Sequence, residues 1–135
     1  VDSLFRLGLR FDEQWALNVR RDESLDFEQL ADKVVDGIQQ GITAWVCAAD
    51  HQAYDLLERL RKRGIKAPED CSITGFDGIA PPAGLPRLTT IKVPFIEMGV
   101  SSVIRLVERM QNPAAQRRHN LVEGDLVLGD STSER

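Results

Sequence analysis

Residues 42–77 read ITAWVCAADHQAYDLLERLRKRGIKAPEDCSITGFD, and this stretch decides the fold class. Its first part, 42–48, is a nearly continuous apolar run, which is typical of a strand buried on both faces of a parallel sheet. Asp50 then offers an N-cap for a helix that Gly64 ends. The apolar stripe of that helix is formed by Ala53, Leu56, Leu57 and Leu60. A second strand follows at 71–76, so the stretch predicts a strand–helix–strand unit with parallel strands.

The sequence before this unit predicts another helix. Asp26 is a candidate N-cap, and Gly41 is placed to end the helix. Apolar residues recur between them at helical spacing, at Phe27, Leu30, Ala31, Val34, Val35 and Ile38. Residues 15–19 (WALNV) predict a short strand ahead of that helix.

The sequence after the unit continues the alternation of strand and helix. A loop rich in Gly and Pro runs from Asp77 to Pro86, and residues 88–93 (LTTIKV) predict a strand. Pro94 suits the start of a helix that Asn112 and Pro113 stop. Its expected buried stripe is Gly99, Val103, Leu106, Val107 and Met110.

The final segment, 118–128, predicts two short extended pieces around Glu123 and Gly124. Strands that alternate with amphipathic helices indicate an α/β fold. We expect an open, mostly parallel sheet with helices on both faces.

Composition argues against direct contact with nucleic acid. The 135-residue chain has a formal net charge of −4 and a sequence pI of about 5.2, whereas nucleic-acid-binding domains usually carry a basic face. The densest basic run, 59–63, falls at the end of a predicted helix, where cations complement the helix dipole. We therefore expect no DNA contact from this chain.

Cys47 and Cys71 lie in predicted strands and match no zinc or redox spacing, so we expect buried, reduced thiols. No apolar run approaches membrane-spanning length, and the first residues show no signal pattern. The chain begins at Val1 rather than at Met, as a cut fragment would. From these features we expect a cytoplasmic protein.

Ligands of open α/β sheets bind outside the carboxyl ends of the strands, which selects a few polar residues. Asp77 follows a strand and could accept two hydrogen bonds from vicinal hydroxyls, or it could cap its own turn. Asp50 also follows a strand, and N-capping alone would explain it. His51 and Gln52 share the same rim.

The chain carries no nucleophile elbow, no phosphate-binding loop with Lys and no dinucleotide fingerprint, so we expect neither an enzyme nor a cofactor. A metal cluster of Asp50, His51 and Asp77 is disfavoured because adjacent residues seldom ligate the same ion.

In order along the chain, these pieces closely resemble the C-terminal effector-binding subdomain of LacI/GalR-type transcription regulators. The matching pieces are Asp50, Gly64, Pro68, Asp70, Gly75-Phe76-Asp77, Leu88-Thr89-Thr90 and Gly99. Leu126-Val127 and Ser131-Thr132 resemble that family's closing strand. The main match covers 26–132. On this basis we expect residues 1–135 to be a fragment of an effector-binding domain, without the DNA-binding head.

The resemblance implies a type I periplasmic-binding-protein-like subdomain that forms one wall of a ligand cleft. In that family the carboxylate of the Gly-[FY]-Asp motif binds effector hydroxyls, which here is Asp77. Ala49 and Val93 stand where relatives often carry polar side chains. The effector-binding residues expected on this basis are Asp77, Asp50, His51, Gln52 and, from the loop after the first strand, Arg21.

The implied function is binding of a sugar or related small molecule, which shifts a homodimeric regulator between operator-binding states. Contact with DNA would then come from a separate head domain, of the LacI or the GntR type. Two alternatives remain. A periplasmic sugar receptor of a transporter shares the fold. A phosphoacceptor receiver domain would use Lys92, but Asp22 and Glu23 make an unconvincing metal-binding pair.

Overall fold

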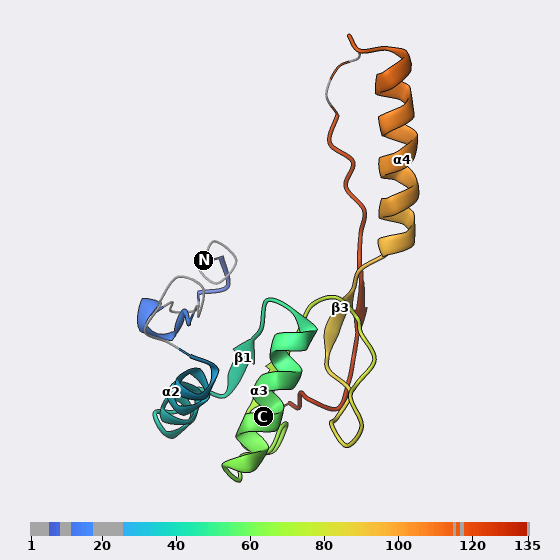
Figure 1. Ribbon diagram of the computed structural model, residues 1–135. Coiled ribbons are helices and arrows are strands. Elements are labelled where there is room, and N and C mark those ends of the chain that lie inside the picture. Colours follow the sequence, from blue (N-terminus) through green and yellow to red (C-terminus); the bar gives the residue numbers. More distant parts are fainter. Residues whose placement is uncertain (1–5, 9–11, 18–25, 115, 117, 135) are drawn as a thin grey trace.

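The computed structural model describes residues 6–8, 12–17, 26–114, 116 and 118–134 (Figure 1). Helices and strands are interleaved along the chain, with the strand–helix–strand unit β1–α3–β2 in its middle. The elements are η1 (Glu13–Trp15), α2 (Phe27–Gln39), β1 (Ala44–Val46), α3 (Asp50–Lys62), β2 (Ser72–Thr74), β3 (Thr90–Lys92), α4 (Phe95–Gln111) and β4 (Asp125–Val127).

Local sequence signals explain α2 fully. The Asp26 carboxylate accepts a hydrogen bond from the Gln29 backbone N–H at 2.8 Å, and the Gln29 side chain accepts one from the Asp26 N–H at 2.8 Å. This reciprocal capping box satisfies two backbone donors at the start of the helix. Most of the predicted stripe faces inward, with Ala31 and Val34 buried, whereas Phe27 at its start is 46% exposed. Gly41 follows the helix with φ of 95°.

The predicted stripe of α3 is also confirmed, since Ala53, Leu56, Leu57 and Leu60 are all buried. The prediction for Asp50 as the N-cap is wrong. Ala49 occupies the N-cap without a side-chain hydrogen bond, and Asp50 is the first helical residue. Its carboxylate turns away from the helix because three other donors bind it, as described below.

The strands are arranged as two short ladders that two isolated bridges connect. β1 pairs parallel with β2, Trp45 opposite Ile73, and β3 pairs antiparallel with β4, Ile91 opposite Leu126. Parallel bridges between Thr74 and Thr89 and between Asp77 and Lys92 join the two ladders. Helix α3 packs on β2, and α2 packs on α3.

The expectation that residues 42–48 form a strand buried on both faces is wrong. Only Ala44–Val46 are strand, Trp45 is buried, and Val46 is 85% exposed. The largest fully buried apolar side chains are Leu60, Ile73 and Leu88, so the core lies between α3 and one face of the β1–β2 ladder.

The predicted strand 15–19 is not observed in its described part. Asp12 caps the short helix η1, which ends at Trp15, while residues 18 and 19 lie outside the described residues. The Trp15 ring packs edge-on against Trp45, with centroids 6.1 Å apart and an interplanar angle of 81°. The apolar residues at 15 and 17 therefore pack against the core without forming a strand, and their spacing only resembles a strand pattern.

Helix α4 begins after Pro94, ends before Pro113 as predicted, and extends away from the other helices beside the segment that leads to β4 (Figure 1). Its expected buried stripe is wrong, because no residue of α4 is buried; Met110 is 72% exposed. Periodicity identified an apolar face, but the described residues bring no second layer against it. Within the segment 118–128, residues Asp125–Val127 form the strand β4. Among the described helices, none has the length and apolar character needed to cross a membrane.

Candidate functional site

The carboxyl ends of three strands meet at Asp77. The backbone N–H of Asp50, just after β1, donates to the Phe76 carbonyl at 2.7 Å. Asp77 itself follows β2, and its N–H donates to the Ile91 carbonyl of β3 at 3.0 Å. Its carbonyl accepts from the Val93 N–H at 3.2 Å. By the strand-end rule this is the candidate site, with Asp77 in its centre.

Asp77 has an unusual backbone. Its φ is 127°, and it is the one non-glycine residue with positive φ among those described. Such a conformation costs roughly 1–3 kcal/mol and persists only where the surroundings impose it. Gly78 follows with φ of 80°, and a Cβ there would lie 2.7 Å from the Lys92 Cα, so the chain needs glycine at that position.

The Asp77 side chain is half-buried, and its carboxylate makes no hydrogen bond within the described part of the chain. Of the two readings of this residue, capping of its own turn is therefore not observed. A partly exposed carboxylate with open acceptor positions can receive donors from a ligand, and vicinal hydroxyls supply two such donors.

Asp50 lies beneath the same loop. The residue is 0% exposed, and its Oδ1 accepts a hydrogen bond from the Thr90 hydroxyl at 2.7 Å. Its Oδ2 accepts from the backbone N–H groups of Gly78 at 2.7 Å and Ile79 at 2.9 Å. We expected Asp50 among the effector-binding residues, but the structure gives it no exposed surface for a ligand.

His51 and Gln52 follow in the first turn of α3, His51 exposed and Gln52 half-buried. Both line an open groove of about 800 Å³ between α2, α3 and η1. Side chains of both helices and of the Trp pair complete the groove, chiefly Trp15, Phe27, Trp45 and Arg59. These aromatic residues were not singled out from the sequence as part of a candidate site.

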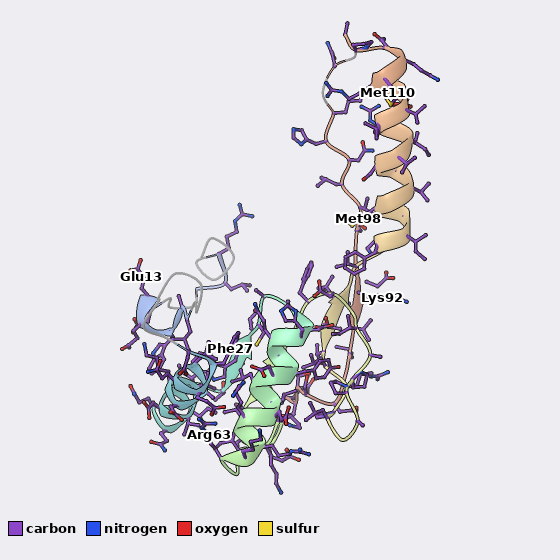
Figure 2. All side chains as sticks on the ribbon, viewed as in Figure 1. Glu13, Phe27, Arg63, Lys92, Met98 and Met110 are labelled. Atoms are coloured by element: carbon purple, nitrogen blue, oxygen red, sulfur yellow. The ribbon has the colours of Figure 1, made fainter. Side chains whose placement is uncertain are left out.

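Ion pairs hold one end of the groove together. Arg63 lies at the C-terminal end of α3 (Figure 2). It donates to Glu28 at 2.9 Å and to Asp32 at 2.7 Å, both on α2. Arg59 pairs with Glu28 and lies 5.8 Å from the centroid of the Phe27 ring. Two members of the basic run 59–63 thus tie α3 to α2, which accounts for them without nucleic acid.

Cys47 faces the groove from the end of β1. Burial raises the pKa of its thiol to about 11, with smaller contributions from the charge of Asp50 and from Cys71. Among the described residues, Cys47 and Cys71 form no disulfide; Cys71 is fully buried and Cys47 half-buried. Among the described residues, no three side chains of the metal-ligating types lie close enough to hold an ion.

Arg21, the remaining residue expected at the site, lies outside the described residues. Sequence reading missed Thr90 and the backbone donors at 78 and 79. The Leu88-Thr89-Thr90 run was noted as a motif, but its link to Asp50 joins positions forty residues apart and leaves no local pattern.

A parallel-strand site of this kind defines a ligand-binding α/β domain, and comparison with known proteins assigns its family. The family described as periplasmic binding protein-like domain matches residues 6–132. The chain therefore belongs to the periplasmic-binding-protein-like domains, of the type found in LacI-family regulators.

Among curated proteins, the chain is 32% identical over 133 residues to the HTH-type transcriptional repressor CytR of Escherichia coli, covering 98% of this chain and 38% of that protein. It is 31% identical to the repressor PurR of Aliivibrio fischeri, covering 95% of this chain and 38% of that protein. The chain thus spans less than two fifths of the length of these relatives.

Solved structures agree with this assignment. A LacI-family regulator from Enterococcus faecium with bound ribose superposes with a TM-score of 0.66 at 27% identity, covering 79% of this chain and 39% of that one. A putative LacI-family regulator from Sanguibacter keddieii gives a TM-score of 0.75 at 26% identity, covering 98% and 51%. The predicted α/β, periplasmic-binding-protein-like fold is confirmed.

Proposed function

We propose that this chain forms one wall of the effector-binding cleft of a LacI-type transcription regulator, and that the effector is a sugar or a related polyol. Asp77 carries the proposal: a carboxylate with open acceptor positions stands at the meeting point of three strand ends. The relatives named above are transcription repressors, and one related structure holds ribose.

In this proposal Asp77 accepts hydrogen bonds from two hydroxyls of the effector, and His51 and Gln52 bind it from the first turn of α3. Arg21 is proposed as a further contact. Since Ala49 and Val93 present no polar side chain at the rim, the polar contacts to the effector concentrate on few residues. Loss of one of them should therefore be costly.

The regulatory step is a shift between two states of a homodimer. An effector changes the equilibrium only by binding one state more tightly than the other. DNA binding belongs in this proposal to a head domain outside this chain, consistent with its net charge of −4, and the protein acts in the cytoplasm.

The proposal is tested by a sugar screen on the full-length protein. Binding of ribose, lactose and cellobiose is measured by titration calorimetry, for the wild type and for Asp77→Ala. Two lost charge-assisted hydrogen bonds should weaken binding by about a hundredfold or more. Asp36→Ala, which removes an exposed carboxylate on α2, is the matched control and should bind as the wild type does.

Two results would oppose the proposal. If Asp77→Ala binds a sugar as tightly as the wild type, Asp77 is no ligand for it. If a sugar that binds has no effect on retention of an operator fragment in a gel-shift assay, the regulatory step is wrong even though the ligand site is right.

A further inference from the structure

A fully buried carboxylate lies directly under the loop that presents Asp77. The three donors that bind Asp50 are neutral, and two of them are consecutive backbone N–H groups, those of Gly78 and Ile79. Consecutive backbone N–H groups after a residue of positive φ form a concave nest for an anionic oxygen. The loop therefore wraps one oxygen of this carboxylate.

The same loop is fixed on its other side by β3. The Asp77 N–H donates to the Ile91 carbonyl of β3, and the Asp77 carbonyl accepts from the N–H of Val93, the residue after β3. The backbone of Asp77 is therefore fixed on both sides of its Cα. The next two residues are bonded to Asp50 instead. Asp77 has its positive φ of 127° at the point where the chain turns from the partners at Ile91 and Val93 to the carboxylate of Asp50.

The space around the carboxylate is closed. Gly75 packs on Asp50 so tightly that a Cβ there would meet the Asp50 Oδ1, and it would lie 3.2 Å from the Asp50 Cα. Oδ1 is engaged by Thr90, a buried residue of β3. The free-energy cost of burying a carboxylate is offset only when every hydrogen-bond donor to it is in place. The Asp50 carboxylate and its three donors therefore have little freedom to move relative to one another.

We infer that Asp50 is a positioning residue: its carboxylate holds residues 77–79 in the turn that presents Asp77, and it touches no effector itself. The link to ligand binding rests on the proposed function of Asp77. The hold on the loop does not, because it follows from the three hydrogen bonds and the burial alone.

Four variants of the full-length protein separate this role from simple stabilisation. Asp50→Ala removes all acceptors. Asp50→Asn is the conservative replacement. Its side-chain oxygen can still accept from the two backbone N–H groups, and its NH₂ group can donate to the Thr90 hydroxyl. Ser131→Ala removes another fully buried hydrogen-bonding side chain, whose partners lie at Thr89 and Ile73, and serves as the matched control. The fourth is the double variant of Asp50→Ala with Asp77→Ala.

The first measurement is hydrogen–deuterium exchange of the peptide that covers 76–80. Asp50→Ala should speed exchange there by about ten- to a hundredfold, the range expected for loss of hydrogen bonds to a charged acceptor. Asp50→Asn should restore most of the protection, and Ser131→Ala should leave this peptide unchanged. If Asp50→Ala does not fold, Thr90→Val removes one donor and should change exchange in the same direction by less.

The second measurement is affinity for ribose, lactose and cellobiose. Asp50→Ala should lose as much affinity as Asp77→Ala, and the double variant should lose no more than Asp77→Ala alone, because Asp50 acts through Asp77. Additive losses would overturn the inference, as would unchanged affinity in Asp50→Ala. If the wild type binds none of these sugars, the proposed function fails for them. Unchanged exchange at 76–80 in Asp50→Ala then still refutes the hold on the loop.

Discussion

Replacement of Asp77 by Gly should stabilise the fold and abolish effector binding at the same time. The residue has φ of 127°, in the region where a Cβ is disfavoured and glycine is not. Asp77→Ala is the reference, since it removes the carboxylate equally but keeps the Cβ. The comparison of Gly with Ala thus isolates backbone strain from every side-chain contact of Asp77.

The magnitude follows from two opposing terms. Relief of the strained φ contributes roughly 1–3 kcal/mol. The greater flexibility of glycine in the unfolded chain opposes it by about 0.5–1 kcal/mol. The Gly variant should therefore exceed the Ala variant by about 1 kcal/mol in the free energy of unfolding. For 135 residues this corresponds to a rise in Tm of about 3–4 °C.

Urea unfolding followed by tryptophan fluorescence measures the difference, because Trp15 and Trp45 pack together near the core. Equal slopes against urea are required for the comparison to report stability. A Gly variant that is less stable than the Ala variant would refute the strain argument. A Gly variant that still binds the sugar found for the wild type would refute the role of the carboxylate.

Three further predictions concern the core and the groove. Ser131→Ala should cost about 2–4 kcal/mol in unfolding free energy, because the buried N–H of Thr89 and a buried carbonyl lose their partner. Gly37→Ala should destabilise by about 1 kcal/mol by urea unfolding, since a Cβ would lie 2.7 Å from Trp45 and overpacking outweighs the gain in helix propensity. Alkylation of Cys47 by iodoacetamide at pH 8.5 should be about a hundredfold slower than in the urea-unfolded protein, because its pKa of about 11 exceeds that of a free thiol.

The first two predictions have a control within the chain, and the third is checked by its pH dependence. Ser133→Ala changes an exposed serine two positions away and should shift stability by less than about 0.5 kcal/mol. Gly99→Ala places a Cβ in open space within a helix and should stabilise, so a gain at Gly37 of similar size would contradict the predicted clash. Alkylation of Cys47 that is as fast folded as unfolded would contradict the raised pKa, whose sign predicts a rate that still rises between pH 9 and 11.

The parts of the fold that the sequence predicted well are those with local signals. Helices α2 and α3 were located by their stripes and by Gly41 and Gly64, which lie within a few residues of the elements they end. Asp77 was singled out for the same reason, since its position directly after the predicted strand 71–76 is a local property. Such features need no knowledge of what packs against them.

Features that depend on distant partners were missed or misread. Asp50 carries the sequence signature of an N-cap, yet its carboxylate binds the loop at 78 and 79, nearly thirty residues away. Trp15 fits a strand pattern, yet its spacing reflects contact with Trp45 across thirty residues. A capping preference and an apolar spacing each have several structural solutions, and only tertiary contact selects among them.

Helix α4 makes the same argument from the opposite side. Its apolar residues follow the spacing that correctly placed the buried face of α3, yet Val103 is 61% exposed where Leu57 is 5% exposed. The difference lies in what each helix meets, because α3 packs on β2 and on α2 while α4 lies apart from both. Periodicity shows which side of a helix is apolar. The spacing of the apolar residues is the same whether or not another layer covers that side. Burial requires two surfaces in contact. The sequence pattern of one helix therefore predicts its apolar face, but it does not predict which element covers that face.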